Sequence, residues 1–450
     1  MIPVPGEIRG TVQRRNHKVY SSSYDNAINY LYDLQKYGIK FGLSSTRNLL
    51  QRLGNPHENL KAIHIAGTNG KGSTAAMLSA ILSGAGHRVG LYTSPHLLRF
   101  NERFRINDQE AEDEEILEVF RGVRRVVDER EPPTFFEMTT AMALSLFASK
   151  QVDWAILEVG MGGRLDATNV IQPQSTIITT ISLEHQEFLG STLKRIAREK
   201  AGIIKEQVPL VTAVNRADVL ALIKVRCMEA RAPCYRVGRE IKVRTLGQGR
   251  FAYRGLGWRL EDLYSPLAGR HQIANAATAL GTLEVLERAD HFRLTTEQIS
   301  RGLARTNWPG RLEWLSRRPP VLVDGAHNYE GIVALCQALQ EAYTYRRLIV
   351  VLGVMADKDL RRMLFKLAPL AERLILTRPR YERRAEPGLL LKLAGGFAER
   401  TVVIRSAQAA LEKAVHLARQ EDLVLVTGSL YFIGEVKEIF ACSSGADSPI

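Results

Sequence analysis

Residues 62–74 read AIHIAGTNGKGST, and this stretch decides the fold class. A short apolar run, Ala62–Ala66, leads into a glycine-rich turn, then a lysine and hydroxyl side chains, and helix-forming residues follow to Ala85. Glycines let backbone N–H groups close on phosphate oxygens, and the N-terminus of a helix adds positive potential. The stretch therefore predicts a strand, a phosphate-binding loop and a helix that together bind ATP. The predicted contacts are Gly67, Thr68, Asn69, Gly70, Lys71, Gly72 and Ser73.

The loop departs from the usual pattern G-x-x-x-x-G-K-[ST] at two places. Ile65 stands where the first glycine is expected, and Gly72 separates Lys71 from Ser73. The alternative interpretation is a tight strand-to-helix turn with an exposed lysine. Repeated glycines together with a lysine and hydroxyls exceed what a turn requires, so we favour phosphate binding.

The length of 450 residues favours two domains, and an apolar fraction of 45% is enough for well-formed cores. No apolar run approaches the ~18 residues that a membrane-spanning helix needs. The polar stretch Met1–Tyr20 lacks the apolar segment of a secretory signal. The four cysteines show no metal-ligand spacing. These features predict a cytoplasmic protein with reduced thiols and no membrane partner.

The net charge of +13 favours anionic partners, since Lys and Arg (61) exceed Asp and Glu (48). The basic residues are dispersed along the chain, and the densest stretch is Arg378–Arg384. No basic strip with interleaved aromatics suggests base stacking, so we expect no nucleic acid partner. ATP, an acidic small molecule or a solvated basic surface would each account for the charge.

Strand-like and helix-like segments alternate through the first part of the chain, which predicts an α/β fold with parallel strands. The predicted strands are Ala62–Ala66, Arg88–Tyr92, Trp154–Val159, Thr176–Ile181 and Pro209–Val214. The predicted helices include Tyr24–Tyr37, Ser45–Leu53, Lys71–Ala85, Glu114–Val127, Thr139–Ser149 and Leu193–Ile203.

The pattern changes after this series. Residues 239–259 predict a small β excursion, and a helix follows at Ile273–Arg288. The segment Thr306–Arg311 contains Pro-Gly and predicts a hinge. A second alternating series then predicts a smaller Rossmann-like domain without a dinucleotide-binding G-x-G-x-x-G. We expect domains at 1–305 and 306–450. The strands of the second series are Val321–Val323, Leu348–Leu352, Arg373–Leu376, Val402–Ile404 and Leu423–Val426.

Polar side chains follow several predicted strands, and ligands bind at the carboxyl ends of strands in such sheets. Glu158 ends one strand, and a carboxylate there suits Mg²⁺ held on nucleotide phosphates. Ser94 and His185 follow two other strands, although His96 is an equally placed imidazole. Asp324 and His327 follow a strand of the second domain. By itself, Lys200 reads as an exposed lysine near a helix C-terminus.

The chain resembles the folylpolyglutamate synthase and dihydrofolate synthase family of the Mur ligase superfamily. The resemblance spans about residues 25 to 435, and the family's phosphate loop has the same Gly-Lys-Gly-Ser ending. The matching stretches are residues 64–73, 93–97, 158–169, 198–203, 271–277 and 324–328, together with His185. The fold implied is a P-loop-containing Mur-ligase-like central domain with an N-terminal helical segment, followed by a C-terminal glutamate-ligase domain.

The resemblance implies an ATP-dependent ligase. A folate or pteroate carboxylate would attack the γ-phosphate of ATP, and the amino group of L-glutamate would displace phosphate from the acyl phosphate. Catalysis of this kind consists mainly of positioning and charge stabilisation. The partners would be small molecules: a pterin or folate, L-glutamate and ATP. We expect a bifunctional, monomeric enzyme.

The resemblance also assigns roles to individual residues. Lys71, Lys200 and His327 would be catalytic, with Lys200 carbamylated to N6-carboxylysine. Two Mg²⁺ ions are expected, with Ser94, Glu158 and His185 as ligands. The remaining assignments are ATP contacts at Asn275, Arg311 and Asp324, and pterin-side contacts at Phe135, Phe136, Leu165, Asp166 and Ala167.

One departure from the family is Glu184, because the family often has aspartate before the metal-binding histidine. We therefore assign Glu184 no role. A muramyl peptide ligase shares the chemistry but usually carries a further N-terminal domain, and only about 60 residues precede the loop here. A nucleotide-dependent switch protein is the third hypothesis, and stimulation of ATPase activity by nucleic acid would support it.

Overall fold

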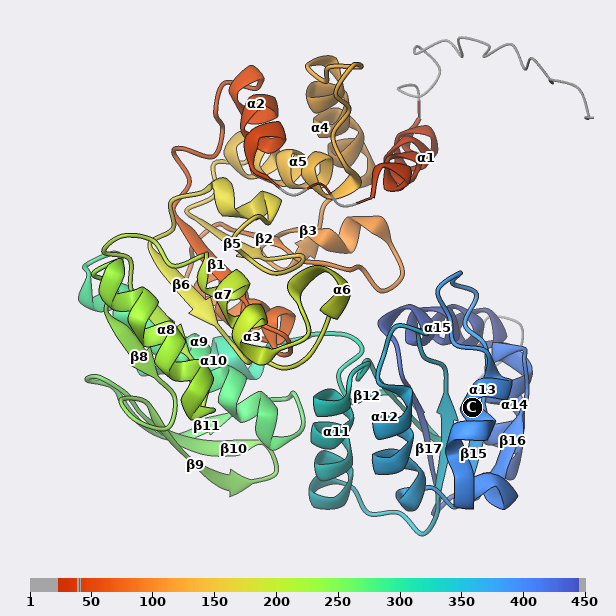
Figure 1. The fold of residues 1–450 in the computed structure, drawn as a ribbon. Helices are drawn as coiled ribbons and strands as arrows, with labels where there is room; N and C mark the ends of the chain where they lie inside the picture. Colours follow the sequence, from red (N-terminus) through yellow and green to blue (C-terminus); the bar gives the residue numbers. More distant parts are fainter. Residues whose placement is uncertain (1–22, 39, 41, 445–450) are drawn as a thin grey trace, which may run out of the picture.

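The computed structural model describes residues 23–38, 40 and 42–444, and two α/β units make up most of them (Figure 1). The predicted polar stretch Met1–Tyr20 lies outside the described residues. Among the described helices, none combines the length and apolar composition needed to cross a membrane. The linker predicted as a hinge, Thr306–Arg311, runs between the last helix of the first unit and the first strand of the second.

The first unit is built on an eight-stranded sheet with the order β4-β3-β2-β5-β1-β6-β7-β8. Six strands are parallel, and five of them correspond to the predicted strands. The sequence did not reveal the parallel strand β8 or the antiparallel edge that β3 and β4 add. The strands are β1 (Ala62–Ala66), β2 (Val89–Tyr92), β3 (Phe104–Ile106), β4 (Gln109–Glu110), β5 (Trp154–Glu158), β6 (Ser175–Ile178), β7 (Leu210–Thr212) and β8 (Cys234–Arg236).

Both faces of this sheet are covered, which explains its continuous apolar strands. In β1, Ile63 and Ile65 join one core, while Ala62 and Ala66 face the opposite side. The first face is covered by α3 (Lys71–Gly84), α9 (Arg270–Arg288) and α10 (Thr296–Ala304). The second face is covered by α1 (Tyr24–Asp33), α2 (Ser44–Arg52), α4 (Asp113–Arg125), α5 (Phe135–Ser149), α7 (Leu193–Ala201) and α8 (Ala217–Glu229).

Helix α5 begins four residues earlier than the predicted start at Thr139. The Oγ1 atom of Thr134 accepts a hydrogen bond from the Glu137 backbone N–H at 3.2 Å, and the Glu137 carboxylate accepts one from the Thr134 N–H at 2.7 Å. This reciprocal capping box fixes the first turn. Phe135 and Phe136 therefore stand on the first turn of a helix, not in a loop.

The predicted β excursion is a three-stranded antiparallel sheet that packs on α9 and α10 (Figure 1). It extends to Tyr264, five residues beyond the predicted end, because β11 pairs with β10. Its strands are β9 (Lys242–Gly247), β10 (Arg250–Arg254) and β11 (Arg259–Tyr264).

The second unit is a six-stranded sheet with the order β12-β13-β17-β14-β15-β16, parallel except for β12. One face packs on α11, α12 and α13, and the other on α14 and α15. The strands are β12 (Glu313–Arg317), β13 (Pro320–Asp324), β14 (Leu348–Leu352), β15 (Arg373–Leu376), β16 (Thr401–Val403) and β17 (Leu423–Thr427). The helices are α11 (Tyr329–Ala342), α12 (Leu360–Leu367), α13 (Pro387–Ala394), α14 (Ala407–Leu417) and α15 (Leu430–Ser444).

Candidate active site

The stretch after β1 forms a loop at the N-terminus of α3. Gly70 has φ +90°, a left-handed conformation that favours glycine, and a Cβ there would lie 2.4 Å from Asn275 Oδ1. Gly67 lies so close to β6 that a Cβ would collide with the Thr179 hydroxyl. The loop therefore needs glycine at both positions, and Asn275 of α9, a predicted ATP contact, lies beside Gly70.

Lys71 folds back over this loop. Its Nζ donates to the carbonyl oxygens of Gly67 at 3.1 Å and Thr68 at 3.3 Å, and lies 3.8 Å from Glu158 Oε1. The buried hydroxyl of Ser73 has no hydrogen-bond partner in the described structure. A buried hydroxyl normally has a partner, so this unsatisfied group fits a site completed by phosphate or by a hydrated cation.

Glu158 is buried at the end of β5 and accepts a hydrogen bond from the Ser94 backbone N–H at 3.3 Å. Burial raises the pKa of Glu158, against the opposing effect of Lys71 and Arg311. Burial lowers the pKa of Arg311, which lies within electrostatic reach of both Asp324 and Glu158. The guanidinium thus links the two units, since Glu158 and Asp324 lie on different sheets.

The predicted metal ligands are arranged around Ser94. Ser94 lines a large pocket together with His185, and a small cavity together with Glu158. Burial lowers the pKa of His185 to about 4, which keeps the imidazole neutral and able to bind a metal. Within the described residues, no three His, Cys, Asp or Glu side chains form a metal-binding group. The donors present, a hydroxyl, a carboxylate and an imidazole, suit Mg²⁺ only together with phosphate or water oxygens.

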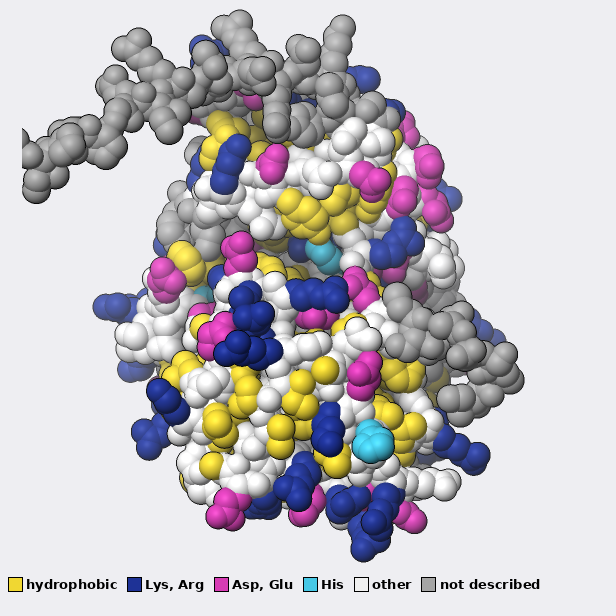
Figure 2. Space-filling view, turned by 90° about the vertical axis from the view of Figure 1, so that its right-hand side faces the viewer, with side chains coloured by type: hydrophobic (Ala, Val, Ile, Leu, Met, Phe, Trp, Pro, Cys, Tyr) yellow, Lys and Arg dark blue, Asp and Glu magenta, His cyan; other side chains and the backbone are white. Residues whose placement is uncertain are grey.

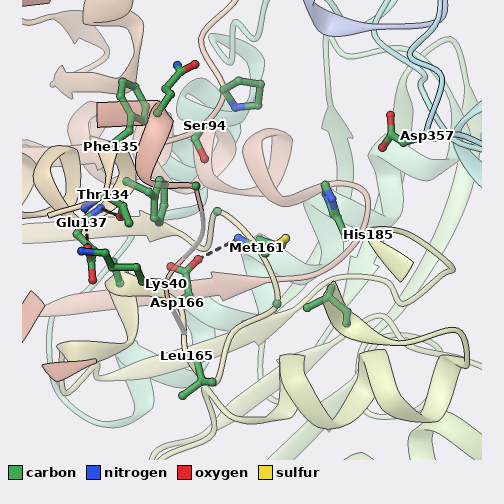
Figure 3. Close-up of a pocket in the computed structure, with 18 of the residues that line it drawn as sticks. Lys40, Ser94, Thr134, Phe135, Glu137, Met161, Leu165, Asp166, His185 and Asp357 are labelled. Carbon is green, nitrogen blue, oxygen red and sulfur yellow. Dashed lines mark hydrogen bonds between the residues drawn. The ribbon is translucent and has the colours of Figure 1, made fainter. Parts of the chain in front are cut away.

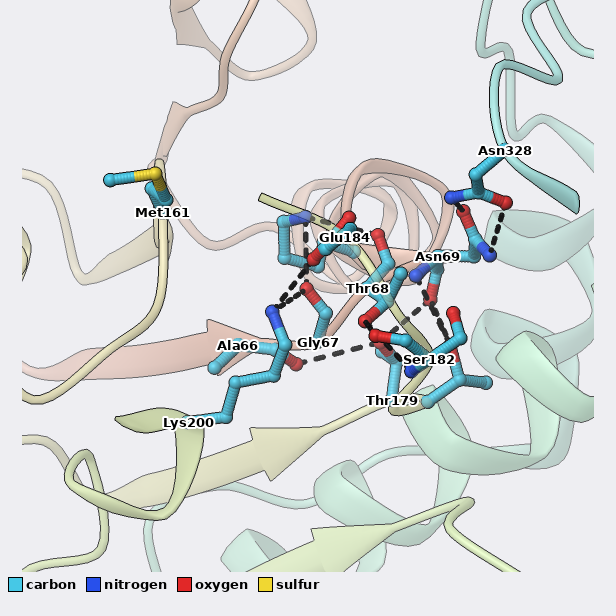
Figure 4. A network of polar contacts seen from close by, with 12 residues as sticks. Ala66, Gly67, Thr68, Asn69, Met161, Thr179, Ser182, Glu184, Lys200 and Asn328 are labelled. Atoms are coloured by element: carbon cyan, nitrogen blue, oxygen red, sulfur yellow. Dashed lines mark hydrogen bonds and ion pairs between the residues drawn. The ribbon is translucent and has the colours of Figure 1, made fainter. Parts of the chain in front are cut away.

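Lys200 differs most from its sequence-based interpretation. It is 1% exposed, not a solvent-facing helical lysine. Its Nζ donates to Gly67 O at 2.8 Å and pairs with Glu184 Oε1 at 2.9 Å (Figure 4). Burial opposes the charge on Glu184, but the Lys200 and Lys71 ammonium groups outweigh it and hold the pKa of that carboxyl at about 2. Glu184, to which we assigned no role, is therefore part of the site.

A pocket of about 490 Å³ lies between the two units. It contains all five predicted pterin-side residues (Phe135, Phe136, Leu165, Asp166 and Ala167), together with Ser94, His185 and His327 (Figure 3). Both Asp166 carboxylate oxygens already accept hydrogen bonds from the chain, from Met161 N–H at 2.9 Å and from Thr168. Asp166 therefore shapes the pocket wall, while the two phenylalanines supply apolar surface.

Arg103 is a pocket residue that sequence reasoning missed. It is buried, lies 5.1 Å from the Phe135 ring centroid, and donates from Nε to His96 Nδ1 at 2.8 Å. No ion pair is described for it. A buried cation without a carboxylate partner fits an anionic ligand. Nothing in its sequence context marks it, because it is one arginine among many. The bond to His96 also occupies the imidazole that competed with His185 as a ligand.

The second unit contributes His327 to this pocket. Its Nδ1 donates to the Gly325 carbonyl at 2.9 Å, so Nε2 keeps a free lone pair. Burial lowers the pKa of His327 to about 4, which keeps the ring neutral. Asp324, a predicted ATP contact, accepts backbone hydrogen bonds from Ala326 at 2.9 Å and Leu312 at 3.0 Å. The Asp324 carboxylate therefore also fixes the backbone at Leu312, directly after the linker.

A reciprocal amide pair joins the phosphate loop to the second unit (Figure 4). Asn69 Nδ2 donates to Asn328 Oδ1 at 3.2 Å, and Asn328 Nδ2 donates to Asn69 Oδ1 at 2.9 Å. Asn328 also caps α11 by accepting from the Gly331 N–H at 2.8 Å. The loop is thus in direct contact with both units.

Charge on the molecular surface is mixed. On the face shown in Figure 2, Lys and Arg side chains form small groups among Asp, Glu and apolar side chains. That face offers no continuous basic stripe among the described residues, in agreement with the dispersed basic residues of the sequence.

Comparisons with known proteins agree with this geometry. Residues 65–283 match the Mur ligase middle domain, and residues 310–430 match the Mur ligase, glutamate ligase domain. The dihydrofolate synthase/folylpolyglutamate synthase of Bacillus subtilis is 34% identical, covering 93% of this chain and 99% of that protein. The corresponding Escherichia coli protein is 33% identical, covering 92% and 94%.

Solved structures give the same result. Folylpolyglutamate synthase of Mycobacterium tuberculosis, complexed with ADP and AMPPCP, has a TM-score of 0.88 at 31% identity and covers 95% of this chain and 100% of its own. Escherichia coli FolC in complex with DHPP and ADP has a TM-score of 0.86 at 32% identity, with coverages of 94% and 99%. The chain belongs to the dihydrofolate synthase/folylpolyglutamate synthase family of Mur ligases.

Proposed function

We propose that this chain is an ATP-dependent ligase that adds L-glutamate to dihydropteroate, to reduced folates or to both. The observation that carries the proposal is the pocket that joins apolar surface from α5 to His327 of the second unit. Ser94 lines both this pocket and the small cavity beside Gly72 of the phosphate loop, where the Ser73 hydroxyl is unsatisfied. The family relationship supports the same reaction. The two steps of this reaction need ATP and an acid on one side of the pocket and an amine on the other.

In the first step, a carboxylate oxygen of the pterin-bearing acid attacks the γ-phosphorus of ATP, and ADP leaves. Lys71 and Arg311 supply positive charge where negative charge accumulates. In the second step, the glutamate nitrogen attacks the acyl carbon, the C–O bond to phosphate breaks, and the nitrogen loses a proton. The free Nε2 of His327 is our candidate to accept that proton. Phe135 and Phe136 would pack against the flat pterin.

The proposal includes Mg²⁺, with Ser94, Glu158 and His185 as the protein ligands of up to two ions. The ion would neutralise phosphate charge and orient the triphosphate. It also includes a cytoplasmic, monomeric protein that acts on small molecules. Size-exclusion chromatography with light scattering tests the monomer directly.

Carbamylation of Lys200 is a separate part of the proposal. Burial lowers the pKa of Lys200, although Glu184 acts in the opposite direction, and a neutral amine is the form that adds CO₂. A carbamate would replace the ion pair with two adjacent anions, whose repulsion a bound cation would relieve. We therefore expect carbamylation only with Mg²⁺ present. A ¹³CO₂-labelled carbamate signal by NMR, absent in Lys200→Ala and after Mg²⁺ removal, tests this without an activity assay.

The reaction itself is tested by ADP release from the purified chain with Mg²⁺ and L-glutamate. Dihydropteroate and tetrahydrofolate are supplied in separate assays, and their relative turnover decides between one activity and both. A UDP-muramyl substrate serves as the comparison acceptor. We expect glutamate-dependent ADP with at least one pterin and none with the muramyl substrate. If ADP release does not depend on glutamate with any of the pterins, the proposal is overturned.

A further inference from the structure

Trp308 lies in the linker between α10 and β12, and its indole packs against the first turn of α3. A Cβ placed on Gly72 would lie 2.8 Å from Trp308 Cζ2 and 2.9 Å from Nε1. Those separations are too short for any side chain, so only glycine at position 72 admits the ring. The extra glycine between Lys71 and Ser73, which departs from the usual phosphate loop, therefore has a steric cause in a residue 236 positions away in the sequence (308 − 72).

The indole has a second described contact. The guanidinium of Arg105, on β3, lies 5.3 Å from the centre of the Trp308 ring. The Arg105 side chain is 11% exposed and forms an ion pair with Glu110 at 3.7 Å. A guanidinium over an indole is attractive, and more so when water is excluded. The ring thus contacts both the phosphate loop and β3, the second strand of the central sheet.

The charged groups of the site lie close to this ring. A small cavity of about 50 Å³ is lined by Gly72, Ser94, Glu158, Trp308 and Arg311, among others. Arg311 follows Trp308 by three residues, and the Gly310 N–H between them donates to Glu313 at 2.7 Å. A shift of the indole would therefore move the backbone that carries Arg311.

We propose that Trp308 is a positioning residue for the nucleotide: its indole, seated on Gly72, holds Arg311 against the phosphate loop. The inference rests on the proposed function of that loop as the ATP site. It predicts that loss of the ring weakens nucleotide binding and, through Arg311, also slows chemistry at saturating ATP. Contacts to the pterin and to glutamate lie in the larger pocket, whose lining does not include Trp308.

The test measures binding of a nonhydrolysable ATP analogue by calorimetry. We expect about tenfold weaker binding in Trp308→Ala and a smaller loss in Trp308→Phe. The KM for ATP should rise and kcat should fall, because Arg311 also supplies charge to phosphoryl transfer. Arg305→Ala is the matched control, because Arg305 is an exposed residue directly before the linker. Unfolding temperatures establish that each variant is folded.

Two outcomes separate this inference from the proposed function. If the wild-type chain does not bind the analogue, the ATP site and this inference both fail. If the wild type and folded Trp308→Ala bind it equally well, only the role of Trp308 fails.

A second variant tests the contact between Gly72 and the Trp308 ring, and does not require Trp308→Ala to retain full stability. Gly72→Ala places a methyl group against the indole and is expected to weaken analogue binding. In the double variant Gly72→Ala/Trp308→Ala the methyl group meets no ring, so the combined loss should be smaller than the product of the two single losses. Single losses that simply multiply would show that the two positions act independently.

Fluorescence supplies a signature that a purely structural role would not produce. The chain has four tryptophans, and only Trp308 is described in contact with the phosphate loop. Addition of the analogue should change the emission of the wild type and of Trp314→Phe, but not of Trp308→Phe. An unchanged response in Trp308→Phe would contradict the proposal.

Discussion

The phosphate loop and the Lys200–Glu184 pair lie side by side and share one acceptor, the carbonyl oxygen of Gly67. Lys71 donates to it at 3.1 Å and Lys200 at 2.8 Å. Lys71 comes from the loop itself and faces an incompletely satisfied site. Lys200 comes from α7, far along the chain, and is fully enclosed with its counter-ion.

The difference shows why one lysine could be interpreted from the sequence and the other could not. The loop is defined by consecutive residues whose conformations and charges suffice for phosphate binding. The second lysine acquires its properties only when β1, the loop after β6 and α7 come together. Four predictions test this contrast, ordered from the largest expected effect to the smallest.

The largest effect is expected from Lys71→Ala. Loss of the ammonium group removes charge stabilisation in phosphoryl transfer, so kcat should fall by about 10³-fold or more. The fold should persist, because the lysine is partly exposed and its hydrogen-bond acceptors are backbone groups. Steady-state ADP release measures kcat, and circular dichroism tests whether the fold persists. Lys413→Ala, at an exposed position of α14, is the control, and normal turnover in folded Lys71→Ala would mean that the loop is misassigned.

Lys200→Ala should reduce both activity and stability. Removing one partner of a buried ion pair leaves the Glu184 carboxylate uncompensated, which costs about 3–5 kcal/mol of unfolding free energy. Denaturant titration measures this loss, which the near-isosteric Glu184→Gln should not reproduce in full. Short carboxylic acids should restore part of the activity of Lys200→Ala if a carbamate is the active form. Full activity without added acid would contradict that role.

The amide pair between the units should have an intermediate effect. Asn69→Ala removes two hydrogen bonds at about 1 kcal/mol each, and we expect a more open cleft in the absence of ligands. Small-angle X-ray scattering should show a larger radius of gyration. Asn328→Ser is the companion variant, since serine still caps α11 but cannot form the reciprocal pair. If neither variant changes the scattering profile, the pair does not hold the units together.

The smallest effect concerns His64, which lies on β1 before the loop. Burial lowers its pKa to about 3, and its Nε2 donates to Thr168 Oγ1 at 2.8 Å. Below about pH 6.5 the unfolded chain therefore binds a proton at His64 that the folded chain does not bind. The free energy of unfolding thus falls as the pH drops towards 3. In His64→Gln this loss should be smaller. Urea unfolding at about pH 7 and pH 4.5 measures it, and parallel pH dependence in both proteins would refute it.

Much of the architecture was predictable because local patterns report it. The buried strands β1, β2 and β5 appear as apolar runs, and Gly70 and Lys71 mark the loop. Strands β3, β4, β8 and β12 were missed, because short strands at or next to a sheet edge bury little and have no distinct pattern. The start of α5 was missed because a capping box, not an apolar face, sets it. Arg103 and Glu184 were missed as site residues because their partners are distant in sequence.

The sequence by itself determined the longer buried strands, most of the helices and the loop that precedes Lys71, because backbone conformation and periodicity are properties of neighbouring residues. Only the tertiary structure decided that Lys200 is enclosed with Glu184, that Asn69 pairs with Asn328, and that Trp308 occupies the space above Gly72. Burial, pairing and steric exclusion depend on which groups meet across the fold, and no stretch of neighbouring residues contains that information.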